Sequence, residues 1–278
     1  MTSAITHTAL RYHGAKFRLA PWIMSFFPAH RTYVEPFGGA AGVLLRKQPA
    51  YAEVYNDLDG EVVSFFRVLR DPAQRAELEH VLTLTPYARE EFKVAYEPAA
   101  NDIERARRLC IRSHMGFGSA ATSGQPVGFR IDTARPYGTA QAVWARYPET
   151  LATVGQRLAG VLIENRPAER IISDHDRPDT LFFVDPPYLH STRKLGESAC
   201  YRHEMTEADH VALLGRLKVV KGMVVLSGYR SDLYADLLSD WISHEKQTAA
   251  ASGRGSATRT EVVWLNPTCA EALKAVTA

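Results

Sequence analysis

The chain has 278 residues, 46% of them hydrophobic and 23% charged, which are ordinary values for a globular protein of one large domain or two small ones. Its formal net charge of +2 is too small to indicate a nucleic-acid partner by itself. No apolar run approaches the roughly 20 residues of a transmembrane helix and no signal peptide is apparent, so we expect no membrane partner. The widely spaced Cys110, Cys200 and Cys269 indicate neither disulfides nor a zinc site and favour a reducing cytoplasm.

Short apolar runs alternate with helical patterns at both ends of the sequence. Residues 61–70 have the wide apolar face of a buried helix, and Thr206 with Asp209 resembles a capping box that opens a helix through residue 217. Residues 40–47 also contain good helix formers. The alternation predicts an α/β fold with a doubly wound sheet. Strands are expected at residues 33–35, 53–55, 161–164, 181–184 and 223–226, with a last antiparallel strand at 261–265.

The middle of the chain breaks this alternation. Residues 101–147 contain seven arginines against three acidic residues, together with glycines and interspersed aromatic residues. We therefore expect residues 85–150 to be a helical and loop-rich insertion between two parts of one α/β domain, 1–84 and 151–278. A second stretch, 248–258, is rich in Ala, Gly and Ser and is expected to be disordered.

The most specific motif is Asp185-Pro186-Pro187-Tyr188, which directly follows the apolar run 181–184. Two prolines end a strand, and ligands of open α/β sheets bind beyond the carboxyl ends of the strands. A carboxylate, free backbone carbonyls and an aromatic ring at this place suit a planar substrate that carries an amino group, such as a nucleobase. A proline-rich turn with a capping Asp and a packed Tyr is the structural alternative.

Two further segments could surround a ligand. The glycine-rich turn 35–42 follows one expected strand, and Asp57 follows the next, where an acid commonly accepts hydrogen bonds from ribose hydroxyls. A tight connection and a helix cap are the alternatives. Near the N-terminus, Lys16 could neutralise a carboxylate or phosphate, unless it belongs to a solvated basic terminus. The scattered histidines His114, His190 and His203 do not indicate a metal site.

Taken together, these segments resemble the D12 class of adenine-N6 DNA methyltransferases, which includes the DNA adenine methylases and many phage and restriction-system enzymes. Their order is the α-type order, with cofactor motifs first, a recognition region in the middle and the catalytic motif after it. The family's first motif usually reads F-x-G-x-G, whereas Ala41 stands at its second glycine here, and tryptophan often replaces Tyr12. The matching segments are Tyr12-His13-Gly14-Ala15-Lys16, Glu35-Pro36-Phe37-Gly38-Gly39, Asn56-Asp57, Asp185-Pro186-Pro187-Tyr188 and Leu226-Ser227-Gly228-Tyr229.

The resemblance implies a Rossmann-like methyltransferase sheet that uses S-adenosylmethionine. Residues 1–84 and 151–278 would then form the catalytic domain, and 85–150 the target-recognition region. Asp57 would bind the ribose of the cofactor and Asp185 would border its methionine end, while Asn165-Arg166 could approach its adenine. The other residues expected at the cofactor are Tyr12, Lys16, Glu35, Pro36, Phe37, Gly38 and Gly39.

The catalytic motif implied by the resemblance is Asp185, Pro186, Pro187 and Tyr188. Adenine N6 is a poor nucleophile and is buried in the duplex, so the base must be flipped out of double-stranded DNA. The Asp185 carboxylate and the Pro186 carbonyl would accept the two N6 hydrogens, and Tyr188 would stack on the flipped ring. The methyl group would then pass directly to N6 in line, without a metal or a covalent intermediate.

The arginine-rich region is expected to recognise the target sequence, because arginine reads guanine and also binds phosphates. Ile103, Ala106, Leu109 and Cys110 would form the buried face of a helix over 102–112, which leaves Arg105, Arg108 and Arg112 on its outer face. For any single arginine, a solvated surface is the alternative. The sequence shows no nuclease motif and no obligatory protein partner, so a restriction system would need a separate endonuclease. The arginines expected at DNA are Arg105, Arg108, Arg112, Arg130 and Arg135.

Other functions use related motifs. N4-cytosine methylation shares the amino-group chemistry, but Asp rather than Ser at position 185 favours adenine. Methyltransferases of RNA or of protein amides more often have Asn there. A catalytically silent DNA-binding module is disfavoured by the intact Asp185 and Lys16, and a nicotinamide dehydrogenase by the missing G-x-G-x-x-G.

Overall fold

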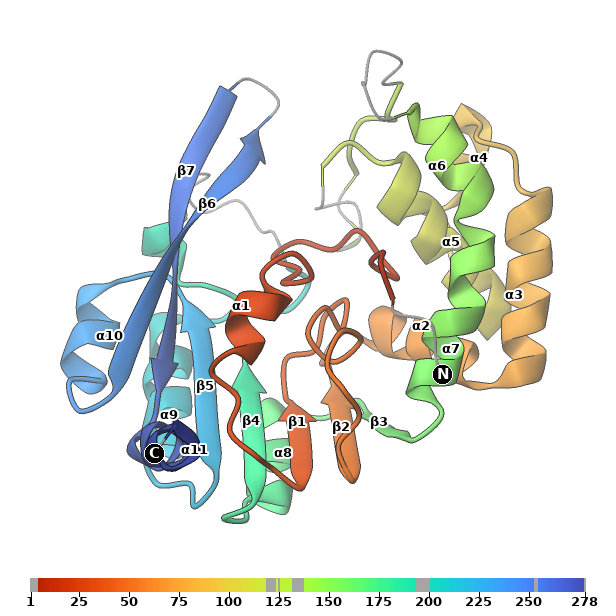
Figure 1. Cartoon of the computed structure of the whole chain (residues 1–278). Coiled ribbons are helices and arrows are strands. Elements are labelled where there is room, and N and C mark those ends of the chain that lie inside the picture. The colour runs from red at the N-terminus through yellow and green to blue at the C-terminus, as the bar shows by residue number, and fades with distance from the viewer. Residues whose placement is uncertain are drawn as a thin grey trace.

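The computed structural model describes residues 5–118, 124, 126–131, 138–193, 201–252 and 255–277, and these contain a seven-stranded sheet of order β3-β2-β1-β4-β5-β7-β6 (Figure 1). The first five strands are parallel and the last two form an antiparallel hairpin. All six predicted strands are confirmed. The bounds are β1 Thr32–Glu35, β2 Ala52–Asn56, β3 Val161–Glu164, β4 Thr180–Val184, β5 Met223–Gly228, β6 Ile242–Ser252 and β7 Gly255–Leu265.

Helices cover both faces of the sheet, as the doubly wound prediction requires. The alternation of side chains along β4 sends Phe183 into an apolar cluster with α2 and α7, and Phe182 into a second cluster with α8 and α9. The predicted capping box of Thr206 and Asp209 is present at the start of α9. The helices are α1 Ala20–Met24, α2 Gly60–Arg70, α3 Pro72–Leu84, α4 Arg89–Val94, α5 Asp102–Met115, α6 Ala140–Arg146, α7 Leu151–Leu158, α8 Ala168–His175, α9 Glu207–Leu217, α10 Asp232–Leu237 and α11 Pro267–Thr277.

The region beyond the carboxyl ends of β4 and β5 lies between two raised parts of the molecule. Figure 1 shows the β6–β7 hairpin rising on one side and α4, α5 and α6 on the other, with the N-terminal segment between them. Helix α5 packs against α2, α3 and α4, and its Ala106 and Leu109 join the apolar cluster of α2. None of the described helices is long and apolar enough to cross a membrane.

Two local predictions are wrong. Residues 40–47 form a series of turns rather than a helix, because Gly39 and Ala41 have φ angles of 47° and 54°, in the left-handed region. The expected disorder of 248–258 is contradicted for 248–252 and 255–258 by the hairpin, in which the register runs from Thr248 opposite Arg259 to Ser252 opposite Gly255, while 253 and 254 lie outside the described residues. The pairing of two distant segments supplies backbone hydrogen bonds that the composition of either segment does not reveal.

Helix α5 also corrects the predicted exposure of one arginine. Arg112 is buried, because its guanidinium pairs with Glu61 of α2 at 2.6 Å and donates to the carbonyl of Ala95. Arg105 and Arg108 are partly exposed and pair with acids of their own helix, Asp102 and Glu104.

Candidate active site

A cavity of about 340 Å³ opens beyond the carboxyl ends of β1, β2 and β4, where the parallel sheet predicts a ligand site. It brings together the N-terminal segment, the glycine-rich turn, the end of β2 and the predicted catalytic motif, of which Asp185 and Pro187 line the cavity, although these segments lie far apart in the sequence. Its lining includes Tyr12, His13, Gly14, Lys16, Glu35, Phe37, Gly38, Gly39, Asp57, Asp59, Pro167, Ala168, Glu169, Asp185, Pro187, Tyr201, Arg202, His203, Glu204 and Met205.

The glycine-rich turn lies against Tyr55 of β2. A Cβ atom on Gly38 would lie 2.2 Å from the Tyr55 ring, so this position admits only glycine without a shift of the ring. Asp57 holds the turn from the neighbouring strand, because its two carboxylate oxygens accept the backbone N–H groups of Gly39 at 2.7 Å and Asp59 at 2.8 Å. Asp59, rather than Asp57, caps α2 by accepting the N–H of Glu61. Burial raises the pKa of Asp57 to about 6.

Glu35 ends β1 as a buried acid. Its Oε1 accepts hydrogen bonds from the Tyr33 hydroxyl at 2.6 Å and from the backbone N–H of Leu44 at 2.7 Å. Burial raises the pKa of Glu35 to about 8, so the side chain is largely protonated at neutral pH. The glutamate therefore ties the glycine-rich turn to the sheet without adding a full negative charge to the cavity.

Asp185 and Lys16 form a buried ion pair at the floor of the site. The Lys16 Nζ lies 3.0 Å from Asp185 Oδ2 and donates to the Gly14 carbonyl at 2.9 Å. Only 5% of Lys16 is exposed, so the alternative of a solvated basic terminus is wrong. The other oxygen, Asp185 Oδ1, is buried without a hydrogen-bond partner among the described residues. Burial raises the pKa of Asp185 and the Lys16 ammonium lowers it.

Tyr188 is buried and is held through its hydroxyl. It donates a hydrogen bond to Glu261 Oε2 at 2.9 Å and lies 3.1 Å from Ser227 Oγ. The Lys16 Nζ lies 4.7 Å from the centre of its ring, and Tyr229 meets the ring edge-on at 4.6 Å. The motif that the sequence singled out is thus braced by residues of three other segments.

Several residues at the cavity were not anticipated. Tyr201 packs against His13, with ring centres 5.2 Å apart, and Arg202 pairs with Glu61 of α2 at 2.7 Å. Glu261 was considered only as the start of a strand. An acid inside the otherwise apolar run 261–265 was a usable signal, because a charged residue is rarely buried without a partner. Tyr201 and Arg202 carry no comparable signal in the sequence.

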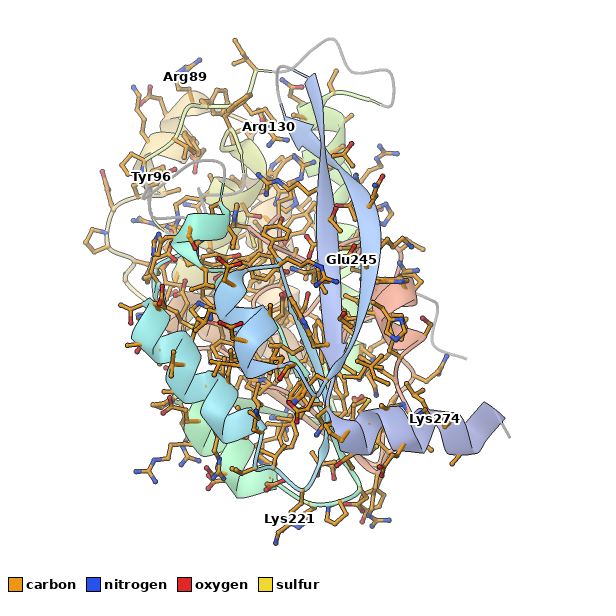
Figure 2. All side chains as sticks on the ribbon, turned by 90° about the vertical axis from the view of Figure 1, so that its left-hand side faces the viewer. Arg89, Tyr96, Arg130, Lys221, Glu245 and Lys274 are labelled. Carbon is orange, nitrogen blue, oxygen red and sulfur yellow. The ribbon has the colours of Figure 1, made fainter. Side chains whose placement is uncertain are left out.

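The predicted DNA-contacting arginines do not meet at the cavity. The described residues that line it include none of Arg105, Arg108, Arg112 and Arg130, and Arg135 lies outside the described residues. Arg130 follows Phe129, whose backbone bridges to Gly116 after α5. Figure 2 shows Arg130 and Arg89 in the same half of the molecule as the free end of the hairpin, away from Lys221.

The sequence also singled out Asn165, Arg166 and several histidines. Asn165 donates to the backbone carbonyl of Asp57 at 2.7 Å, and Arg166 pairs with Asp174, while the next residues, from Pro167 onward, line the cavity. His114 is buried, and burial lowers its pKa to about 3. The described residues contain no group of three or more His, Cys, Asp or Glu side chains suited to a metal ion.

Comparison with known protein families identifies a related family. A family model described as D12 class N6 adenine-specific DNA methyltransferase matches residues 12–250, which is most of the chain. The matched segment begins at Tyr12 and includes the glycine-rich turn and Asp185–Tyr188, and it ends before Glu261. No curated protein matches the sequence.

Proposed function

Because the chain belongs to the D12 class N6 adenine-specific DNA methyltransferases, and is therefore an enzyme that methylates adenine N6 in DNA, we propose that its methyl donor is S-adenosylmethionine bound in the cavity. The bound cofactor would supply an electrophilic methyl group on a sulfonium sulfur. The turn at Gly38 and Gly39 is the proposed cradle, since it brings the backbone to the cavity wall. Asp57 would receive the ribose hydroxyls, and Tyr12 would pack beside it.

The observation that carries the proposed adenine contact is that Asp185 Oδ1 is buried and has no hydrogen-bond partner among the described residues. Burying an acceptor without a partner is unfavourable by about 1–3 kcal/mol, so this acceptor, on a residue that lines the cavity, supports contact with a substrate donor. Adenine N6 has two hydrogens to donate. We propose that Asp185 Oδ1 and the Pro186 carbonyl accept them, while Pro187 keeps the turn rigid. The carboxylate would then stabilise the positive charge that develops on N6.

Tyr188 completes the proposed base site. The flipped adenine would lie against its ring, and base–aromatic stacking is worth about 1–3 kcal/mol per base. Double-stranded DNA would enter between the hairpin and helices α4 to α6, which rise on opposite sides of the site (Figure 1). We propose that Arg105, Arg108, Arg130 and Arg135 contact phosphates or guanines there. Because Arg112 is buried against Glu61, its proposed contribution is to hold α5 in place.

The test is transfer of labelled methyl groups from S-adenosylmethionine to unmethylated double-stranded DNA. Asp185→Asn keeps the shape of the side chain but has one acceptor oxygen. If that oxygen faces Lys16, the amide NH₂ faces the adenine amino group and cannot accept from it. We expect kcat to fall at least about 100-fold, as for other groups that stabilise developing charge. Lys221→Ala, at the opposite end of β5, is the matched control (Figure 2).

Digestion of the product to nucleosides completes the experiment. The proposal requires N6-methyladenine in the wild-type product and a large loss of rate in both Asp185→Asn and Tyr188→Ala. Equal rates in the wild type and these two variants would overturn the assigned roles. N4-methylcytosine in the product would overturn the proposed substrate contacts.

A further inference from the structure

Glu261 lies on the same face of the sheet as the residues of the candidate active site. Side chains alternate along each strand, so Ser227 of β5 shares its face with Val225, and Glu261 of β7 shares its face with Val263. Val225 and Val263 belong to one apolar cluster, and the antiparallel pair Ser227–Val263 places β7 beside β5. The hairpin therefore delivers a carboxylate to the side of the sheet where Asp185 emerges.

The contacts of Glu261 connect it to the catalytic motif. Only 8% of the residue is exposed, and its Oε2 accepts the hydrogen bond from the Tyr188 hydroxyl at 2.9 Å. No ion pair within 4.0 Å joins Glu261 to a cation in the part of the chain that is described. A buried carboxylate is unfavourable unless it is hydrogen-bonded or paired, and apolar residues of similar volume would be tolerated at least as well for stability alone. The Tyr188 hydroxyl is thus its hydrogen-bond donor, and the Lys16 ammonium, whose pKa Glu261 raises, adds electrostatic attraction to an acid at this position.

We propose that Glu261 is a positioning residue for methyl transfer, which acts by accepting the Tyr188 hydroxyl and holding the Tyr188 ring in the orientation on which the flipped adenine stacks. The inference rests on the proposed function of the site. Pro186 and Pro187 make the backbone of the motif rigid, but they leave the side-chain torsions of Tyr188 free. Tyr229 borders the ring at its edge and Lys16 lies toward its centre, so the remaining restraint acts on the hydroxyl, which donates to Glu261 Oε2 at 2.9 Å and lies 3.1 Å from Ser227 Oγ.

This role predicts that Glu261 and Tyr188 act as a unit. Tyr188→Phe retains a ring that can stack but loses the hydroxyl, whereas Glu261→Ala retains the hydroxyl but loses its acceptor. Each change should lower the single-turnover rate of methyl transfer by about tenfold or more, which is the usual effect of losing a hydrogen bond to a charged group. The double variant Tyr188→Phe/Glu261→Ala should be no slower than the slower single variant, because both changes remove the same interaction.

The rates should be measured with saturating S-adenosylmethionine and double-stranded DNA on the full chain. We expect kcat to fall with little change in the KM for DNA, and Glu261→Gln, which keeps an acceptor oxygen, to recover part of the lost rate. Glu271→Gln, an exposed acid on α11, is the control for loss of one negative charge. Glu261→Gln also keeps the test valid if Glu261→Ala fails to fold, because the cycle can then be closed with Glu261→Gln and Tyr188→Phe.

The outcomes distinguish a failure of the proposed function from a failure of the positioning role of Glu261. A wild-type protein that transfers no methyl group to DNA contradicts the proposed function. An active wild type with losses that multiply in the double variant contradicts only the positioning role of Glu261. A Glu261→Ala variant that melts at a lower temperature but keeps the wild-type kcat also contradicts it, since the residue would then serve stability alone.

Discussion

Replacing Lys16 with Met should shift the acid side of the pH–rate profile toward alkaline pH. Burial raises the pKa of Asp185, and the Lys16 ammonium, 3.0 Å away, is the main influence that lowers it. Without the ammonium the pKa of Asp185 rises further, so the carboxyl is protonated over a wider pH range. A protonated Asp185 loses the negative charge that stabilises the developing positive charge on N6. The variant should therefore be slow near neutral pH and regain rate as the pH is raised.

The expected size follows from the geometry of the pair. Two unit charges 3.0 Å apart interact by about 5.5 kcal/mol at an effective dielectric constant of 20. Removing one partner of a buried pair is unfavourable by about 3–5 kcal/mol, and protonation of Asp185 relieves most of that loss. Since 1.36 kcal/mol corresponds to a factor of ten, we expect kcat to fall by about 10- to 100-fold at pH 7. At least about tenfold should return by pH 9.

The assay is single-turnover methyl transfer between about pH 6 and about pH 9.5, with the Kd for S-adenosylmethionine measured at both ends of the range. Lys221→Met, an exposed lysine before β5, is the matched control and should keep the wild-type profile. The reasoning would be refuted by a Lys16→Met profile of unchanged shape. A large increase in Kd with that unchanged profile would instead indicate that Lys16 serves the cofactor.

Four further substitutions test other features of the fold. The raised pKa of Glu35, about 8, predicts a wild-type contribution to stability that is complete below about pH 4.5 and is lost as the pH rises through 8. Glu35→Gln should remove this dependence, on the order of 4 kcal/mol, in urea unfolding at low and high pH. Ala41→Gly should raise the free energy of unfolding by about 1 kcal/mol, because the φ of Ala41 is left-handed, and a lower melting temperature would contradict this. Arg112→Ala should lower the free energy of unfolding by about 3–5 kcal/mol, because it breaks a buried ion pair. Arg105→Ala should lower it by less than about 1 kcal/mol and should reduce the salt dependence of DNA binding. Equal free energies of unfolding for the two variants would count against the buried pair.

The elements that could be predicted are those specified by residues close to one another in the sequence. The apolar run 181–184 and the capping box of Thr206 and Asp209 specify their elements locally, and both are present. Residues 40–47 have the composition of a helix, but Glu35 takes the N–H of Leu44 and Ala41 adopts a left-handed φ. The hydrogen bond comes from a residue of β1, and the composition of 40–47 does not encode it. The hairpin strands beyond residue 248 were missed for the same reason, since each depends on its partner.

At the candidate site, too, some features could be predicted from the sequence and others could not. The sequence correctly indicated which segments meet, because strand ends of a parallel sheet share one edge. It did not indicate what each side chain contacts there. Lys16 was expected at the cofactor, and it lines the cavity while its ammonium also pairs with Asp185. Arg112 was expected on the outer face of its helix, but Glu61, 51 positions earlier in the chain, pairs with it in the interior. Pairings of this kind depend on how distant helices pack, which single-residue patterns do not record.

The charges around the catalytic motif lead to one more consequence for the proposed reaction. The nearby Glu261 carboxyl raises the pKa of Asp185, and Lys16 is the cation that pairs with Asp185. Glu35 is largely neutral near pH 7 because burial raises its pKa to about 8. The two other acids, Asp185 and Glu261, lie near one cation, Lys16, so acidic groups outnumber basic ones here and any net charge is negative. That charge favours a sulfonium and a positively charged N6, and the attraction declines once the sulfur is neutral and N6 has lost its proton. The same arrangement that stabilises the transition state would therefore also weaken the hold on both products.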